Sequence, residues 1–425
     1  MGREGYKPFV SGHSPRQRPR RLIARSAQRV AVTPPPFRFA RRMAAIPPSF
    51  LGRLFAVSAD PSVISFAGGL PSPAVLDAAG IADAAAGVFA DEGPRALQYA
   101  TTDGLLPLRE FIAARYRRRA GLDVTAANVQ IVNGSQQCLD LVAKVMLDPG
   151  ESVGIEAPGY LGAIEAFSLY EPRFSAVPVD EAGPDLGALE RALAGARPRF
   201  FYAVPNSQNP SGLTYPDSAR RAVAGLLAGS GTLLYEDDAF GELFFDGRPR
   251  RPVGAALPGK AVLTGSFSKV LAPGMRCGWI VAPEPFLSLF NVAKQAADLH
   301  SNHLCQLVLM RWLETRDYDA QCRRVARGCE RNCRALLDAL DDLCPGLGHT
   351  TPEGGMFLLA RLPPGVSSLD LFEEGIRRGV AVMPGRPFYL EGGDDVVRLN
   401  FSNTDEDGIA RGCERLRDAL HALGG

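Results

Sequence analysis

The feature that most constrains the fold is a series of short apolar runs, each followed at once by a turn of small and polar residues. Four of these runs cover residues 129–132, 153–156, 200–204 and 232–235, and they recur between stretches of helical spacing. Short strands that alternate with helices are typical of a mostly parallel sheet covered by helices on both faces. Such a sheet binds ligands at the carboxyl ends of its strands, so the polar residues after each run are candidates for a functional site.

One turn carries a lysine in a setting that favours covalent chemistry. Residues 264–279 read TGSFSKVLAPGMRCGW, and Lys269 stands among small and apolar residues. A lysine held partly out of water has a lowered pKa, and its neutral amine attacks aldehydes. The hydroxyls of Ser266 and Ser268 and the guanidinium of Arg276 are groups that together bind a phosphate. An imine-forming lysine beside a phosphate clamp points to pyridoxal 5'-phosphate, although a Ser-x-Ser-Lys loop alone is more often an ordinary surface turn.

A second turn has the form of an anion site. The strand expected at 129–132 leads through Asn133 and Gly134 into a segment with Leu139 and Val142 on one helical face. A helix start offers free backbone N–H groups and the positive end of the helix dipole, which attract a phosphate. We expect the phosphate at this point, with a simple capped helix as the alternative.

An arginine near the C-terminus needs an anionic partner. Arg398 lies inside the apolar run 396–402, where an unpaired charge is costly. The α-carboxylate of a substrate would supply the partner. A structural pair with a carboxylate of the protein is the common alternative.

These segments resemble, in order and spacing, the motifs of class I and II aminotransferases, which are fold type I enzymes that use pyridoxal 5'-phosphate. Residues 264–279 resemble the SxSK…PGxRxGW signature, in particular that of the branch with the aminoadipate and kynurenine aminotransferases. The resemblance runs from about residue 43 to the C-terminus. Further motifs in the order of the family are FAGGLP at 66–71, QY…GxxxLR at 98–109, GSQQ at 134–137, PGY at 158–160, VPNxxNPTG at 204–212, GGMF at 354–357 and RxxFS at 398–402.

The resemblance implies a role for each residue around the cofactor. Lys269 forms the imine, and Asp237, after the run 232–235, keeps the pyridine nitrogen protonated. Tyr160 lies against the face of the ring, and Asn209 donates a hydrogen bond to the phenolic oxygen. The residues implied to hold the phosphate are Ser135, Gln136, Ser266, Ser268 and Arg276, joined by Tyr99 of the neighbouring subunit in an obligate homodimer.

The implied reaction is the transfer of an amino group from an L-amino acid to a 2-oxo acid such as 2-oxoglutarate. Arg398 would bind the substrate carboxylate, Gly69 of the FAGGLP turn would pass beside it, and Asn209 would line the same place. In each half-reaction the freed amine of Lys269 would move a proton. Two alternatives share these motifs: a lyase or decarboxylase that uses the same cofactor, and a cofactor-binding transcription regulator, for which the basic N-terminal segment is short.

Two departures from the family pattern bear on the substrate and on the cofactor. Relatives that act on acidic side chains often carry an arginine in the helix expected at 49–57, where this chain has Gly52, with Arg53 one place on. One position turns a helical side chain by about 100°, so a neutral or aromatic donor is favoured, with aminoadipate as the alternative. Phe240 replaces a tyrosine that donates to the phenolic oxygen in most relatives. His300 and His303 could line the site, although packed or surface histidines are more common.

The resemblance implies an α/β fold with a mostly parallel seven-stranded sheet sandwiched by helices and a smaller α+β domain. We expect a disordered basic extension over 1–42, an N-terminal helix and arm over 43–75, a large cofactor-binding domain over 76–305 and a small domain over 306–425. The extension carries eleven basic residues and one acid, a composition with little to bury. Its removal should leave activity and solubility intact.

Composition bounds the remaining classes of function. A net charge of +1 gives no case for binding nucleic acid or acidic membranes, and no apolar run approaches the ~18 residues of a membrane span. The eight cysteines are scattered, with no CxxC pair to complete a zinc site and no hydrophobic signal segment. We therefore expect no metal, reduced thiols and a cytoplasmic location.

Overall fold

The computed structural model describes residues 37–44, 50, 52 and 60–424. Most of the extension predicted to be disordered, residues 1–42, lies outside the described residues, and so do Arg53 and most of the helix expected at 49–57. The first 45 residues form a unit of their own, in which α1 (Arg41–Ala44) is described, and residues 46–425 form a second, compact unit. All other elements belong to this second unit.

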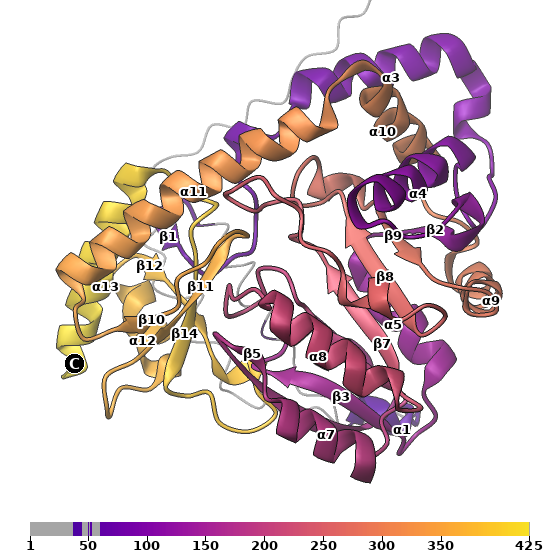
Figure 1. The fold of residues 1–425 in the computed structure, drawn as a ribbon. Coiled ribbons are helices and arrows are strands. Elements are labelled where there is room, and N and C mark those ends of the chain that lie inside the picture. Colours follow the sequence, from indigo (N-terminus) through magenta and orange to yellow (C-terminus); the bar gives the residue numbers. More distant parts are fainter. Residues whose placement is uncertain (1–36, 45–49, 51, 53–59, 425) are drawn as a thin grey trace, which may run out of the picture. The chain divides into compact units, whose positions relative to one another are not determined.

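The larger sheet has eight strands in the order β2-β9-β8-β7-β6-β3-β4-β5 (Figure 1). Neighbouring strands from β8 to β4 run parallel, whereas β9 is antiparallel to β8 and β2, and β5 is antiparallel to β4. The predicted mostly parallel sheet is confirmed, and the two-residue edge strand β5 adds to the seven strands expected. The strands are β2 (Val129–Val132), β3 (Ser152–Ala157), β4 (Arg173–Asp180), β5 (Gly183–Pro184), β6 (Phe200–Ala203), β7 (Leu233–Asp238), β8 (Ala261–Ser266) and β9 (Gly278–Val281).

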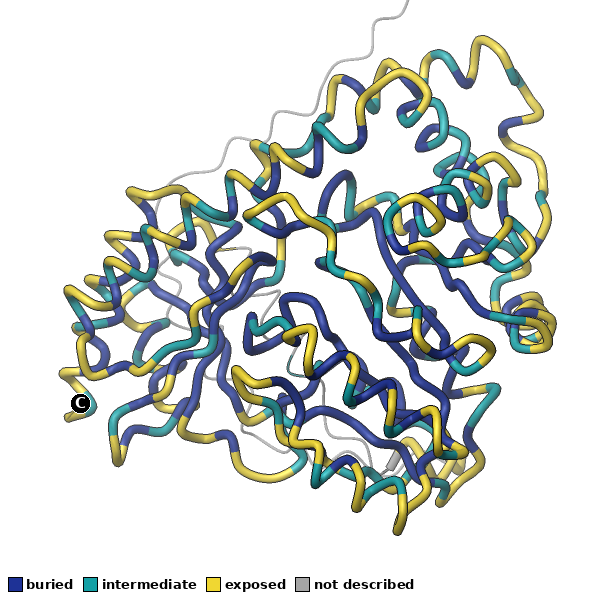
Figure 2. Tube along the Cα trace, in the orientation of Figure 1, coloured by how far each residue is buried: buried dark blue, intermediate teal, exposed yellow. Residues whose placement is uncertain are grey.

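Apolar side chains cover both faces of this sheet, because successive residues of a strand point to opposite sides. In β6, Phe200 and Tyr202 belong to one apolar cluster, and Phe201 and Ala203 belong to another. The first cluster includes residues of α5, α6 and α9, and the second includes residues of α4, α7 and α8. Figure 2 shows the central strands buried along nearly their whole length and the helices exposed on one side, whereas β4, near the edge of the sheet, is largely exposed or partly buried. These helices are α4 (Leu106–Ala120), α5 (Ser135–Met146), α6 (Leu161–Ser168), α7 (Leu186–Gly195), α8 (Asp217–Ala228) and α9 (Phe286–Asp298).

A second sheet is antiparallel, in the order β10-β11-β14-β13, and β1 pairs in parallel with β12. The runs expected as strands around 354–359 and 396–402 form β11 and β14. These strands are β1 (Ile64–Ser65), β10 (Gly348–His349), β11 (Phe357–Arg361), β12 (Val380–Ala381), β13 (Met383–Pro384) and β14 (Val396–Asn400). The remaining helices are α3 (Ala78–Glu92), α10 (His303–Thr315), α11 (Tyr318–Leu343), α12 (Ser368–Arg377) and α13 (Glu406–Ala422).

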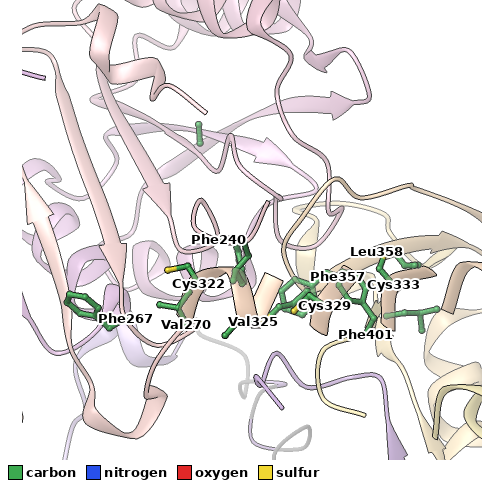
Figure 3. Packing of buried hydrophobic residues seen from close by; sticks show 14 of the residues in the cluster. Phe240, Phe267, Val270, Cys322, Val325, Cys329, Cys333, Phe357, Leu358 and Phe401 are labelled. Atoms are coloured by element: carbon green, nitrogen blue, oxygen red, sulfur yellow. The ribbon is translucent and has the colours of Figure 1, made fainter. Parts of the chain in front are cut away.

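The long helix α11 connects the cores of the two sheets. Its side chains Cys322, Cys329 and Cys333 belong to one apolar cluster that reaches from Phe267, after β8, to Phe401, after β14 (Figure 3). Apolar residues at i, i+3, i+4 and i+7 give a helix one continuous buried stripe. The stripe on α11 therefore packs into one apolar cluster with residues that follow strands of both sheets.

Those carboxyl ends bring the polar turns together. β3 is followed by the turn at 158–160, and β6 by the loop 205–212. Asp237 is the penultimate residue of β7, and β8 leads directly into the loop that carries Lys269. The strand ends of a parallel sheet lie at one edge, so segments that are more than a hundred residues apart meet there.

Candidate active site

Lys269 lies half-buried just after β8, and its Nζ donates a hydrogen bond to the Gly69 carbonyl at 2.9 Å. Burial, together with the charges of Arg398 and Arg276, lowers the pKa of its amine to about 8, and Asp237 acts in the opposite direction. The amine can therefore become neutral, and nucleophilic, near physiological pH. Of the other described lysines, Lys144 and Lys294 pair with carboxylates and Lys260 is held by three backbone carbonyls.

Asp237 is a buried carboxylate near the end of β7, and its side chain has fixed partners. Tyr202 donates its hydroxyl to Oδ2 at 2.8 Å, and Thr264 donates to Oδ1 at 3.1 Å. Burial raises the pKa of Asp237 to about 6, while these two hydrogen bonds oppose the rise. The carboxylate is held in place on the sheet edge and is within electrostatic reach of Lys269.

The turn before α5 has the features of an anion site. Gly134 has φ +74°, and a Cβ at this position would lie 2.4 Å from Nη2 of Arg276, so glycine is required there. Arg276 in turn donates to the Asn133 carbonyl at 3.2 Å. No side chain caps α5, which leaves the N–H groups around Ser135 and Gln136 for a ligand.

Two serines lie at the end of β8 beside this turn. The hydroxyls of Ser266 and Ser268 are 2.9 Å apart, and both side chains are buried. Ser266 Oγ also accepts a hydrogen bond from the Ser268 backbone N–H at 3.1 Å. These local hydrogen bonds therefore hold the two serine hydroxyls at the carboxyl end of β8.

Tyr160 lies at the start of α6 and is linked to the anion site through Gln136. Its hydroxyl donates to Oε1 of Gln136 at 3.4 Å, and Nε2 of Gln136 donates to the Gly162 carbonyl at 3.1 Å. A Cβ at Gly162 would lie 2.6 Å from the Tyr160 ring, so this glycine makes room for the ring. Burial raises the pKa of Tyr160 to about 12, and the hydroxyl therefore stays protonated.

Arg398, on β14, is a buried cation whose two hydrogen bonds go to neutral oxygens. Nη1 donates to Oδ1 of Asn209 at 2.8 Å, Nη2 donates to the Ala67 carbonyl at 2.6 Å, and Nε has no partner. Its Cζ lies 4.1 Å from the centroid of the Phe357 ring and 5.1 Å from that of the Phe388 ring. Burial lowers the pKa of Arg398 to about 9, so it remains a cation at neutral pH. Within residues 60–424, no carboxylate forms an ion pair with it.

Asn209 is oriented by Arg398. Since the guanidinium donates to Oδ1, the amide presents Nδ2 as a donor, which is the orientation that its predicted hydrogen bond to the cofactor requires. Phe240 is 3% exposed, and its ring centroid lies 5.8 Å from Lys269 Nζ. The residue that replaces the tyrosine of most relatives therefore faces the lysine.

Tyr99 contrasts with the buried site residues. Its side chain is 77% exposed, and its ring packs edge-on against His300 with the centroids 5.7 Å apart. The predicted role of Tyr99 toward a neighbouring subunit stays a prediction.

Burial lowers the pKa of His303, whose Nδ1 has no partner, while Nδ1 of His300 lies 2.8 Å from the Ser301 carbonyl.

The residues present fit pyridoxal 5'-phosphate. Three features suit an anionic group: the start of α5, which no side chain caps, the close approach of Arg276 to Gly134, and the unpartnered Nε of Arg398. The amine of Lys269 suits an aldehyde, and Asp237 suits a protonated ring nitrogen. Among residues 37–44 and 60–424, no group of three His, Cys, Asp or Glu side chains could hold a metal ion.

Sequence reasoning did not single out the residues that orient the predicted ligands. Tyr202 and Thr264, which hold Asp237, lie inside apolar strands and carry no motif. The buried Lys294 and the partly exposed Asp298, at the end of α9, bond to each other and to the anion turn. The one available signal was a lysine in the middle of an apolar helical stretch.

Two further observations concern the chain as a whole. All eight cysteines are free. In the part of the chain that the structure describes, no helix combines the length and the apolar character that a membrane crossing requires.

Comparison with known proteins agrees with this geometry. The family model described as aminotransferase class I and II matches residues 63–416. The 2-aminoadipate transaminase of Thermus thermophilus is 41% identical over 393 residues, which cover 91% of this chain and 97% of that protein. Aromatic-amino-acid aminotransferase 1 of Thermococcus litoralis is 35% identical over 366 residues, which cover 84% of this chain and 88% of that protein.

A solved structure is similar over nearly the whole chain. The α-aminoadipate aminotransferase of Thermus thermophilus, complexed with N-(5'-phosphopyridoxyl)-L-leucine, superposes with a TM-score of 0.85 at 39% identity. The match covers 91% of this chain and 97% of that one.

Proposed function

The chain belongs to the class I and II aminotransferases, fold type I enzymes that depend on pyridoxal 5'-phosphate, and we propose that it transfers the amino group of a neutral or aromatic L-amino acid to an oxo acid such as 2-oxoglutarate. The observation that carries the choice of substrate class is Arg398. Its guanidinium is buried, its Nε is unpartnered, and no carboxylate among residues 60–424 pairs with it. An α-carboxylate that arrives with the substrate would complete its bonds.

The cofactor supplies an aldehyde for Lys269 and a ring that takes up electrons from the substrate. Lys269 Nζ carries a proton to and from the substrate, because a pKa of about 8 allows it to accept and release one near neutral pH. Asp237, fixed by Tyr202 and Thr264, holds a negative charge for the ring nitrogen. Tyr160 would lie against the ring, and Asn209 would donate a hydrogen bond from Nδ2. The residues that would bind the phosphate are Ser135, Gln136, Ser266, Ser268 and Arg276.

The surroundings of Arg398 support a donor with an uncharged side chain. Phe357 and Phe388 flank the guanidinium, and Phe240 faces Lys269. One relative is named for aromatic amino acids, and another was solved with a phosphopyridoxyl adduct of leucine. 2-Aminoadipate remains the alternative donor, because the relative at 41% identity is named for it.

We also propose a homodimer and a cytoplasmic location. Leu97, Tyr99, Leu106 and Val292 are between 53% and 77% exposed, and a dimer interface over them would take their apolar surface out of water. In such a dimer Tyr99 would reach the phosphate of the partner subunit's site. The free and mostly buried cysteines suit a reducing compartment. We also propose that residues 76–305 form a large domain and residues 306–425 a small domain.

A donor panel tests the proposal. The protein is loaded with cofactor and given 2-oxoglutarate with one amino acid at a time, and glutamate, ammonia and carbon dioxide are measured. We expect glutamate, with a higher kcat/KM for phenylalanine or leucine than for 2-aminoadipate. A preference for 2-aminoadipate would contradict the proposed donor. Ammonia or carbon dioxide without glutamate would contradict amino transfer and indicate a lyase or decarboxylase.

A further inference from the structure

A buried ion pair lies at the end of α9, against the turn that precedes α5. Lys294 and Asp298 are one helical turn apart, and Nζ of Lys294 donates to both carboxylate oxygens at 2.7 Å. The side chain of Lys294 is fully buried, and that of Asp298 is 21% exposed. A buried charge pair of this kind is costly to assemble and does not by itself stabilise a fold, so its position calls for an explanation.

The pair holds both ends of the turn over residues 133–137. Oδ2 of Asp298 accepts from Nδ2 of Asn133 at 2.6 Å and from Nε2 of Gln137 at 2.8 Å. Oε1 of Gln137 in turn accepts from the Asn133 backbone N–H at 2.8 Å and from Lys294 at 3.3 Å. Asn133 is thereby fixed through its backbone and its side chain, and its carbonyl accepts the hydrogen bond of Arg276.

The charges of the pair matter because the turn is suited to an anion. A lone carboxylate at Asp298 would repel an anionic group in the turn, and a site with few compensating charges would feel that repulsion strongly. Lys294 donates to both oxygens of this carboxylate and cancels its charge. Asp298 can then act as an acceptor that shapes the turn without opposing the ligand.

We propose that Lys294 and Asp298 are a positioning pair for the cofactor phosphate: Asp298 fixes the shape of the turn over residues 133–137, and Lys294 neutralises Asp298. This inference rests on the proposed function, in which Ser135 and Gln136 of that turn bind the phosphate. Neither Lys294 nor Asp298 is expected to touch the ring or the substrate.

The test compares two ligands that differ only in the phosphate. Apoprotein variants are titrated with pyridoxal 5'-phosphate and with pyridoxal, and binding is followed by absorbance. For Lys294→Met we expect the affinity for pyridoxal 5'-phosphate to fall on the order of 10- to 100-fold, which is the range seen when residues that hydrogen-bond to the ligands of a metal ion are removed. The affinity for pyridoxal should change little. The double variant Lys294→Met/Asp298→Asn should recover part of the loss, because the uncompensated carboxylate is gone.

Three further variants make the outcome decisive. Lys144→Met breaks a lysine–aspartate pair with the same spacing on the exposed side of α5, and it should change neither affinity. Arg276→Ala should lose affinity for pyridoxal 5'-phosphate alone. If it does not, the proposed phosphate site is wrong and the inference falls with it. If Lys294→Met does not fold, Lys294→Gln, which keeps a donor but no charge, decides by the same criterion.

Equal losses for both ligands in the Lys294 variant would show a general structural role and overturn the inference. An unchanged affinity for pyridoxal 5'-phosphate, in a protein where Arg276→Ala does weaken it, would overturn the inference and leave the proposed function standing.

Discussion

Arg398→Met removes the cation that we propose for the substrate carboxylate and keeps an unbranched side chain between the Phe357 and Phe388 rings. The guanidinium is 5% exposed and has an unpartnered Nε, so the carboxylate would bind it away from water. Loss of one partner of such a buried, hydrogen-bonded charge pair costs about 2–5 kcal/mol. At about 1.4 kcal/mol per tenfold, kcat/KM for an amino acid should fall roughly 30- to 4,000-fold.

The assay separates carboxylate recognition from general damage. We would measure kcat/KM for phenylalanine and for phenethylamine, which has the same amine and side chain but no carboxylate. Only the value for phenylalanine should fall. The matched control is Arg361→Met, on the adjacent strand β11, which removes an exposed arginine paired with Asp395 and should change neither value. Equal losses for both substrates, or no loss for phenylalanine, would refute the role of Arg398.

Three further predictions follow from the surroundings of Lys269. The rate at which the apoprotein captures pyridoxal 5'-phosphate, measured by stopped flow, should rise as the pH passes through about 8, because burial lowers the pKa of Lys269 and only the neutral amine reacts. A rise centred near the ordinary lysine pKa of about 10.4 would contradict this prediction. Tyr202→Phe removes a hydrogen bond that lowers the pKa of Asp237, so the carboxylate should become protonated at higher pH. The pH below which the protein loses affinity for the cofactor should rise accordingly, and binding titrations that show no such rise would contradict the role of Tyr202. Phe240→Tyr should add a donor to the phenolic oxygen and lower the midpoint of the absorbance pH titration of the bound cofactor by about one unit, equal to about 1.4 kcal/mol. An unchanged midpoint would argue against the assigned position of Phe240, and a raised midpoint would contradict the hydrogen-bond argument itself.

The central part of the fold could be predicted from sequence because its strands are buried on both faces. The runs at 129–132 and 200–204 are mostly apolar, and they form β2 and β6, with Val204 just beyond the end of β6. The resemblance implied seven strands, and edge strand β5, with two residues and no apolar pattern, could not be added from the sequence. The helix expected at 49–57 lies mostly outside the described residues.

The candidate site was predicted only where a residue stands in a motif. Lys269, Asp237 and Arg398 follow or lie in apolar strands, and their residue types are unusual there. The partners that orient them come from distant parts of the chain: Tyr202 reaches Asp237 from the neighbouring strand β6, and Lys294 reaches the turn before α5 from α9. Such contacts depend on tertiary packing, and local sequence does not show which residue each of these side chains reaches.

The covalent link between Lys269 and the cofactor can be measured directly, since the chain has five lysines. The protein is loaded with pyridoxal 5'-phosphate, reduced with borohydride and digested, and the modified lysine is identified by mass spectrometry. We expect the phosphopyridoxyl group on Lys269 and, in Lys269→Ala, neither a specific adduct nor amino transfer. A specific adduct on Lys260 or Lys294, or turnover near the wild-type rate in Lys269→Ala, would contradict the assignment of the active site.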